Sequence, residues 1–155
     1  MKKVLLTSVL FATAAASVQP VFADAKEDAV KARRAYYQVV SFYAGPLFGM
    51  AQGKVAYDAQ KAQMHADNLK ALASMKNGAM WIPGTDNEAM KGKTRALKAI
   101  WAADSKIGEA VKAFNDATAT LAKVAGNGLN ELRPAVAALG QTCGGCHKPY
   151  RASRF

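Results

Sequence analysis

Apolar residues recur at intervals of three and four along most of the chain, the spacing that places side chains on one face of an α-helix. The alternation of Val, Ile and Thr that is typical of strands is scarce. Four segments show the helical period, at about 26–52, 59–77, 96–125 and 129–152. The pattern therefore predicts an all-α protein of four amphipathic helices.

Each predicted helix has an apolar stripe at helical spacing. The stripes are Val30, Tyr37, Val40, Ala44 and Leu47; Leu69, Leu72, Ala73 and Met80; Leu97, Ile100 or Trp101, Ile107, Val111, Phe114, Leu121 and Val124; and Leu129, Leu132, Val136, Leu139, Cys143, Cys146 and Tyr150. Helices of this length with mostly short connections form an antiparallel up-down-up-down four-helix bundle.

Breaks in the pattern mark the expected helix ends. Pro46 predicts a kink or an early end of the first helix, because proline removes a helical hydrogen bond. Asp58 is placed as the N-cap of the second helix, and Asn77-Gly78 as its stop. Residues 78–95 are the long irregular stretch, and residues 126–128 end the third helix.

The N-terminus has the features of an export signal. Lys2 and Lys3 precede the apolar run Val4 to Ala16, which is too short to span a bilayer. We interpret residues 1–23 as a cleaved signal peptide and residues 24–155 as one mature domain; a retained anchor is the alternative. The protein is then expected outside the cytoplasm, most simply in a bacterial periplasm, without a membrane span after cleavage.

The positive charge does not indicate a nucleic-acid partner. The 155 residues include 21 Lys and Arg against 11 Asp and Glu, a net charge of +10 that falls to +8 when Lys2 and Lys3 are removed. The basic residues are spread along the whole chain and form no motif that reads DNA. We interpret them as a solvated surface that keeps the protein soluble.

Both cysteines lie in the segment Cys143-Gly144-Gly145-Cys146-His147. A thioredoxin-like site would follow a strand, and a structural zinc site would need more ligands than His65 can add. Cys-x-x-Cys-His is the attachment sequence of c-type haem. Positions i, i+3 and i+4 share one helical face, so two thioethers and an axial imidazole can hold one porphyrin. The motif predicts one covalent haem c through Cys143 and Cys146, with His147 as the iron ligand.

The position of the motif restricts the sixth ligand. Eight residues follow His147, and none is methionine. A further ligand would come from upstream, and in an antiparallel bundle the natural source is the first helix.

Four blocks of the sequence resemble the cytochrome c prime family, the class II c-type cytochromes. They are residues 27–33, 57–59, Pro83-Gly84-Thr85 and the C-terminal block 143–151. The resemblance implies a four-helix bundle with five-coordinate, high-spin iron that binds NO and CO. It also implies a non-enzymatic role in electron transfer or NO handling, and a homodimer formed through the first two helices.

The resemblance also implies roles for individual residues. Cys143 and Cys146 match the thioether cysteines, His147 the proximal ligand, Arg33 an arginine beside the haem propionates, Arg34 the position after it, Tyr37 the residue that caps the vacant face of the iron, Trp81 an aromatic residue lining the haem, Thr94 or Arg95 a propionate contact, and Arg151 a basic residue flanking the proximal pocket. Arg33 and Arg34 are alternatively charges exposed to solvent, and Arg151 is alternatively a charge that complements the C-terminus of its helix.

Two other functions remain open. A low-spin electron-transfer protein would need a methionine as sixth ligand, but the first helix has Met50 only at its far end. A peroxidase would need an acid–base group beside the iron, and no distal histidine is evident, since His65 is expected at the surface. The gas-binding interpretation is therefore preferred.

The expected dimer needs an apolar seam on the first two helices. Five residues are candidates for it: Tyr36, Val39, Tyr43, Phe48 and Met64.

Overall fold

The computed structural model describes residues 21–153, with side chains from Ala25 onward. Its helices are α1 (Val21–Ala51), α2 (Ala59–Ala73), η1 (Gly78–Met80), η2 (Lys98–Trp101), α3 (Ile107–Val124) and α4 (Leu129–Tyr150), of which η1 and η2 are 3-10 helices. Within the described range, no residues form a strand, apart from one isolated bridge between Ala96 and Arg151. The all-α prediction is confirmed.

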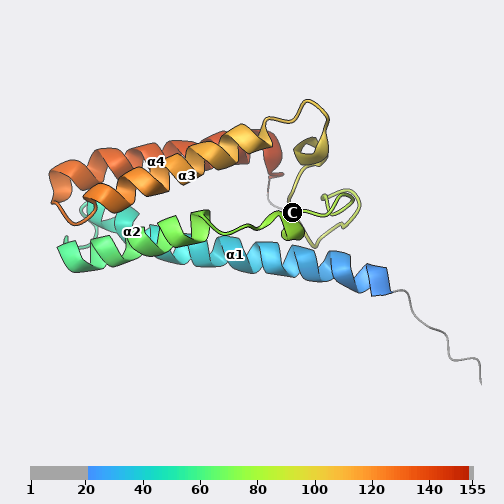
Figure 1. Ribbon diagram of the computed structural model, residues 1–155, viewed down its shortest axis with the longest axis horizontal. Coiled ribbons are helices and arrows are strands. Elements are labelled where there is room, and N and C mark those ends of the chain that lie inside the picture. Colours follow the sequence, from blue (N-terminus) through green and yellow to red (C-terminus); the bar gives the residue numbers. More distant parts are fainter. Residues whose placement is uncertain (1–20, 154–155) are drawn as a thin grey trace, which may run out of the picture.

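The four long helices form the predicted up-down-up-down bundle. In Figure 1 they lie along the long axis of the molecule, and each reverses the direction of the one before it. Each packs against its successor, and α4 closes the arrangement by packing against α1. The longest connection, residues 74–106, lies at the same end as the C-terminus (Figure 1).

The main hydrophobic core occupies the end of the bundle away from that connection. Its members are Tyr36, Val40, Leu47, Met50, Ala62, Ala66, Leu69, Leu121, Ala125, Leu132, Ala135, Val136 and Leu139. Leucines from all four helices are fully buried here, and burial of each stabilises the fold by about 1.5–3 kcal/mol. The apolar stripes of α1 and α4 continue beyond this core toward the other end.

Most of the predicted signal peptide, residues 1–20, lies outside the described residues, and Val21 to Ala23 belong to the first turn of α1. In the part of the chain that the structure describes, none of the helices combines the length and the hydrophobicity needed to cross a membrane.

Pro46 does not end the first helix, so the predicted early end is wrong. The helix α1 continues to Ala51 with Pro46 inside it. Proline cannot donate to the carbonyl of Phe42, four residues earlier. The side chain of Phe42 is 67% exposed, so this part of the helix faces solvent. Packing of Leu47 and Met50 into the core holds the last turn in place.

The second helix ends four residues before the predicted stop. Asp58 is its N-cap as predicted, accepting a hydrogen bond from Lys61 N at 3.0 Å. Ser74 caps its C-terminus, since its N–H donates to Lys70 O and its hydroxyl to Ala71 O. The predicted Asn77-Gly78 stop instead leads into η1, and Met80 lies in that short helix.

The third helix begins at Ile107, eleven residues later than predicted. Residues 95–97 are held in another conformation because they pair with the end of the chain: Leu97 N donates to Tyr150 O and Ala152 N donates to Arg95 O. The bridge between Ala96 and Arg151 also ends α4 at Tyr150, short of the predicted residue 152. Apolar periodicity in this segment therefore reflects packing without an α-helix.

Tyr57 holds together the closed end of the bundle, the end that lies away from residues 74–106. Its hydroxyl donates to Ala125 O at 2.9 Å and accepts from Gly128 N at 2.9 Å, so one side chain holds both sides of the turn between α3 and α4. Gly128 has a φ of +117°, a conformation that favours glycine, and its carbonyl accepts from Leu132 N at the start of α4.

Replacement of Tyr57 by Phe tests this contact. The variant leaves two backbone groups without their partner, and we expect a loss of roughly 1–3 kcal/mol in the free energy of unfolding, measured by urea denaturation. Tyr43→Phe is the matched control, because the structure records ring contacts but no hydrogen bond for Tyr43 among the described residues. An equal loss in both variants would contradict the proposed contribution of the hydroxyl.

Candidate functional site

The three residues of the Cys-x-x-Cys-His motif continue the core stripe of α4. Leu132, Val136 and Leu139 are buried on one face of the helix, and Cys143, Cys146 and His147 follow at steps of three and four. Unlike the leucines, they are only half-buried, and the thiols form no disulfide. The face that carries the core at one end of the bundle therefore carries reactive groups at the other.

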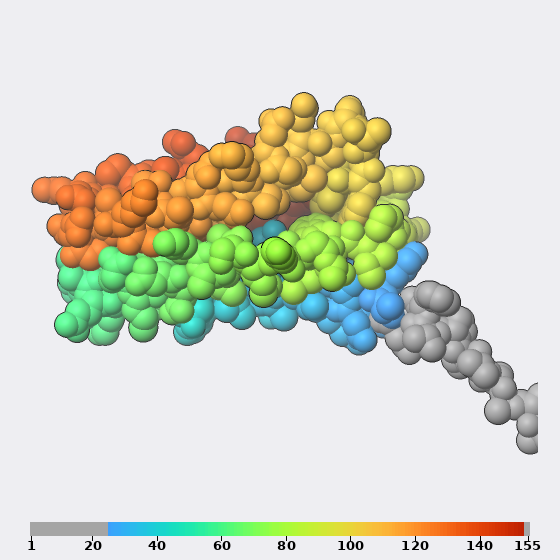
Figure 2. All heavy atoms as spheres, viewed as in Figure 1, coloured from blue at the N-terminus to red at the C-terminus, as the bar shows by residue number. Residues whose placement is uncertain are grey.

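Tyr37 on α1 lies opposite this face. Burial raises the pKa of its hydroxyl well above the usual range, and the nearby Cys146 thiol raises that pKa further. The Tyr37 ring stands edge-on to Trp81, with 6.3 Å between the ring centroids. Figure 2 shows a hollow between α3 and the chain that follows α2, with the last turns of α4 at its base. The bundle is therefore open where it carries the motif.

These residues fit a covalently attached haem by the chemistry of the donor set. Two free thiols at i and i+3 and an imidazole at i+4 face the open end of the bundle. Burial lowers the pKa of His147, and the charges of Arg151 and Arg95 lower that pKa further, which favours the neutral form that a metal ligand needs. Within residues 21–153, no three His, Cys, Asp or Glu side chains are grouped to hold a metal by themselves. Iron held in a porphyrin needs no such group.

Arg33 is buried beside the cleft, with 4% of its surface exposed. Its Nη1 donates to Met80 O (3.2 Å) and Thr85 Oγ1 (3.1 Å), and its Nη2 donates to Thr85 O (3.0 Å) and Thr94 Oγ1 (2.9 Å). All of these acceptors belong to the connection between α2 and α3. The alternative of a solvent-exposed Arg33 is wrong, because this guanidinium fastens the connection to α1.

Two tryptophans of the same connection stack on Arg33. The guanidinium carbon lies 4.6 Å from the ring centroid of Trp81 and 6.0 Å from that of Trp101, and Trp101 Nε1 donates to Trp81 O at 3.1 Å. Burial lowers the pKa of Arg33, and no carboxylate forms an ion pair with it among the described residues. Cation–π contacts and four hydrogen bonds replace a counter-ion.

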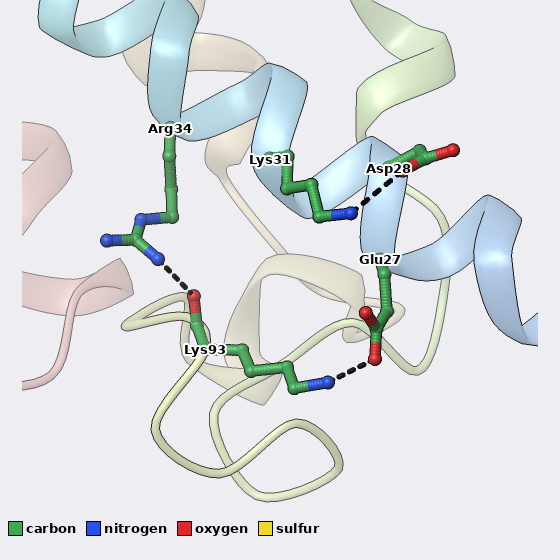
Figure 3. A network of polar contacts seen from close by, with 5 residues as sticks. All are labelled: Glu27, Asp28, Lys31, Arg34 and Lys93. Atoms are coloured by element: carbon green, nitrogen blue, oxygen red, sulfur yellow. Dashed lines mark hydrogen bonds and ion pairs between the residues drawn. The ribbon is translucent and has the colours of Figure 1, made fainter.

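The other predicted site residues lie around this cluster. Arg34 is exposed and donates to Lys93 O at 3.2 Å (Figure 3), while Thr94 is buried and also accepts from Ala96 N. Arg151 follows the last residue of α4 and pairs with Ala96. The Nε and Nη2 of Arg95 both donate to Ala152 O. The roles toward a haem predicted for Arg33, Arg34, Thr94 or Arg95, and Arg151 remain predictions.

One exposed ion pair joins the same connection to α1, and a second lies beside it within α1. Figure 3 shows Lys93 reaching Glu27 on α1, and Lys31 paired with Asp28 one turn further on. Such exposed pairs contribute about 0–1 kcal/mol each. The connection therefore depends chiefly on the buried Arg33.

Sequence reasoning missed the acceptors of Arg33 and misplaced part of the dimer seam. Thr85 has no predicted role of its own, although a threonine beside Pro-Gly is a common turn residue. Tyr36 belongs to the core, and its hydroxyl donates to Leu72 O. Phe48 packs against the core and Gly140, so neither aromatic residue lies in an outer seam. The expected surface position of His65 is also only partly correct: it is half-buried against the Tyr43 ring.

The chain matches known proteins over most of its length. The family model described as Cytochrome C' matches residues 28–151. A cytochrome c′ of Cereibacter sphaeroides is 38% identical over 154 residues, covering 99% of this chain and 100% of the relative. A solved cytochrome c′ from Rhodobacter sphaeroides superposes with a TM-score of 0.80 at 38% identity, covering 83% of this chain and 98% of that one.

Other matching structures describe ligand and dimer states. A cytochrome c′ variant from Alcaligenes xylosoxidans with bound NO has a TM-score of 0.71 at 27% identity, covering 83% of this chain and 97% of that one, and another variant of that protein has carbon monoxide bound. A further cytochrome c′, with a TM-score of 0.74 and 27% identity over the same shares, is described as having ligand-controlled dimer dissociation.

Replacement of Arg33 by Met tests the buried clamp. The variant leaves backbone and hydroxyl acceptors in the connection without a donor, and we expect a loss of roughly 2–4 kcal/mol in the free energy of unfolding, with faster proteolysis within residues 78–95. Arg34→Met is the control, since that neighbouring arginine is exposed and makes a single hydrogen bond. If Arg33→Met and Arg34→Met were equally stable and equally resistant to proteolysis, the Arg33 side chain would not be what holds the connection.

Proposed function

Because the chain belongs to the cytochrome c′ family, we propose that it is an exported, periplasmic haem c protein with five-coordinate, high-spin iron. In this proposal it binds the diatomic gases NO and CO and exchanges single electrons. One observation carries the proposal: Tyr37 on α1 lies near the Cys143 and Cys146 thiols of α4, and its phenol, whose pKa is raised by burial and then by these thiols, is a weak ligand. The NO and CO complexes of matching structures support the choice of ligands.

The family carries haem c, and this chain has two cysteines for covalent attachment. In the proposal Cys143 and Cys146 form the thioethers and His147 is the proximal ligand. When bound, the haem supplies an iron atom that takes up a gas molecule and cycles between ferric and ferrous states. The chain would contribute the His147 imidazole as the ligand of the iron and the Tyr37 ring as a neighbour of the binding site.

The remaining residues of the cleft fix its shape and charge. Trp81 supports the Tyr37 ring and is proposed to line the haem. Arg33 brings a buried positive charge to the cleft, and Arg34, Thr94 and Arg151 are proposed to lie at its edge toward the propionates and the proximal side. Tyr37 opposes every ligand by its bulk, so the ligand that bonds iron most strongly is expected to tolerate it best.

Two observations disfavour the alternatives. A low-spin protein of this class would need a methionine from α1 to face the iron, but Met50 is 2% exposed and belongs to the core at the other end of that helix. A peroxidase would need an acid–base side chain beside the vacant face. The ring contacts of Tyr37 are with Tyr36 and Trp81, and His65 lies on α2 against Tyr43. We therefore propose a binding and electron-transfer role without enzymatic turnover.

Optical spectra of the ferric and ferrous protein, together with Tyr37→Ala, test this function. The wild type is expected to be high-spin in both states. Removal of the Tyr37 ring is expected to raise CO affinity roughly ten-fold, the factor that corresponds to about 1.4 kcal/mol of repacking. The measurement is CO titration of the ferrous protein. Tyr37→Phe keeps the ring and is expected to bind CO like the wild type. A low-spin wild type would refute five-coordination, and unchanged CO affinity in Tyr37→Ala would show that another residue covers the iron.

We further propose a homodimer through α1 and α2. Val39, Phe42 and Met64 are exposed apolar residues on these helices, and Phe42 packs against Tyr43. We therefore add Phe42 to the predicted seam and remove Tyr36 and Phe48 from it. Repulsion between positively charged copies is screened within about 8 Å at physiological salt. The matching structure with ligand-controlled dimer dissociation supports a dimer in this family.

The dimer is tested with Phe42→Glu, which places a charge in the seam. Sedimentation at micromolar concentration is expected to give a dimer for the wild type and a monomer for this variant. Val111→Glu is the control, because Val111 is an exposed apolar residue on α3. A dimer that persists in Phe42→Glu, or one that is lost equally in Val111→Glu, would argue against this interface.

A further inference from the structure

The chain that follows the motif is held by backbone pairing with the segment before η2. We call this pairing the C-terminal strap; it joins residues 95–97 to residues 150–152. Leu97 N donates to Tyr150 O at 3.0 Å, and Ala152 N donates to Arg95 O at 2.8 Å. Arg95 adds two side-chain hydrogen bonds to Ala152 O, from Nε at 2.9 Å and Nη2 at 2.6 Å. The strap thus lies directly after the helix that carries His147.

One hydrogen bond connects the strap to His147. Arg151 N donates to His147 O at 3.1 Å, and Arg151 is the residue that pairs with Ala96 in the isolated bridge. The hydroxyl of Tyr150 also accepts from Lys106 N at 2.9 Å, one residue before α3. Movement of the last turn of α4 would therefore break contacts with the segment on both sides of η2.

The helix around the motif is weak by composition. Gly144 and Gly145 are poor helix formers, and Pro149 cannot donate a hydrogen bond to Gly145 O. A Cβ built at Gly144 or Gly145 would meet nothing within 4 Å, so neighbouring packing does not hold these two residues. Contacts from outside the helix therefore matter more for the last turn of α4 than for a turn without glycine and proline.

We propose that the C-terminal strap, with Arg95 as its key side chain, is a positioning device that fixes the orientation of the His147 imidazole toward the haem iron. Arg95 acts through Ala152 and the last turn of α4, so it is a positioning residue rather than a ligand. The inference rests on the proposed function, because it takes His147 as the proximal ligand.

Two variants weaken the strap in different ways. Leu97→Pro removes the N–H that donates to Tyr150 O, and the φ of −81° and ψ of 149° at this position suit proline. Leu97→Ala keeps that N–H while shortening the side chain, so it is the matched control. Arg95→Met removes both side-chain hydrogen bonds, and Arg95→Lys can restore one. Arg34→Met controls for the loss of an arginine elsewhere in the same region.

Two measurements are made on the haem-loaded protein. Amide hydrogen exchange at Arg151 and Ala152 reports opening of the strap, and we expect roughly ten-fold faster exchange in Leu97→Pro and Arg95→Met. Resonance Raman spectroscopy of the ferrous protein reports the iron–histidine stretching vibration, which we expect to shift to lower frequency in the same two variants. Leu97→Ala and Arg34→Met are expected to leave both readouts unchanged, and Arg95→Lys to recover most of the wild-type values.

The outcomes separate the strap from other roles. Faster exchange without a shift of the vibration would make the strap merely structural and overturn the proposal. A shift in Arg95→Met that Leu97→Pro does not share would mean that Arg95 acts on the haem directly, which also overturns it. If Leu97→Pro does not fold, the test rests on the two Arg95 variants: both readouts should change in Arg95→Met and return toward the wild-type values in Arg95→Lys. Absence of an iron–histidine vibration from the wild type would instead refute the proposed function itself.

Discussion

The open end of the bundle depends on a single buried cation. A guanidinium without a counter-ion is costly to bury, and Arg33 is compensated by four hydrogen bonds and by stacking on Trp81. Its acceptors lie at Met80, Thr85 and Thr94, on both sides of the Pro83-Gly84 turn. The connection between α2 and α3 is too irregular to hold itself by helical hydrogen bonds. Arg33 therefore decides where this segment lies, and with it one wall of the cleft.

The closed end of the bundle makes this arrangement possible. Leucines from all four helices are fully buried there, and the hydroxyl of Tyr57 joins the turn between α3 and α4 to the start of α2. The apolar stripe of α4 is buried as far as Leu139, and on the same stripe Cys143 and His147 are only half-buried. Stability at one end thus permits an incompletely packed site at the other.

Periodicity predicted the bundle, because each helix buries one face against the others. It also placed the Cys-x-x-Cys-His motif on the inner face of α4 and Asp58 at an N-cap. It failed for residues 96–106, where Leu97 and Ile100 have helical spacing but backbone pairing with the C-terminus imposes another conformation. That pairing joins segments more than fifty residues apart, so no local pattern contains it. For the same reason the sequence did not disclose the acceptors of Arg33.

Arg33 and Tyr37 are four residues apart on α1, and this spacing connects the buried cation to the proposed binding face. Arg33 fixes the connection that carries Trp81, and the Trp81 ring in turn stands edge-on to Tyr37. Tyr37 also packs edge-on to Tyr36, whose hydroxyl is tied to Leu72 O. The ring that faces Cys146 is therefore supported from the loop and from the core at once. In the proposed function, the resistance of Tyr37 to an incoming ligand is then set as much by these supports as by its own bulk.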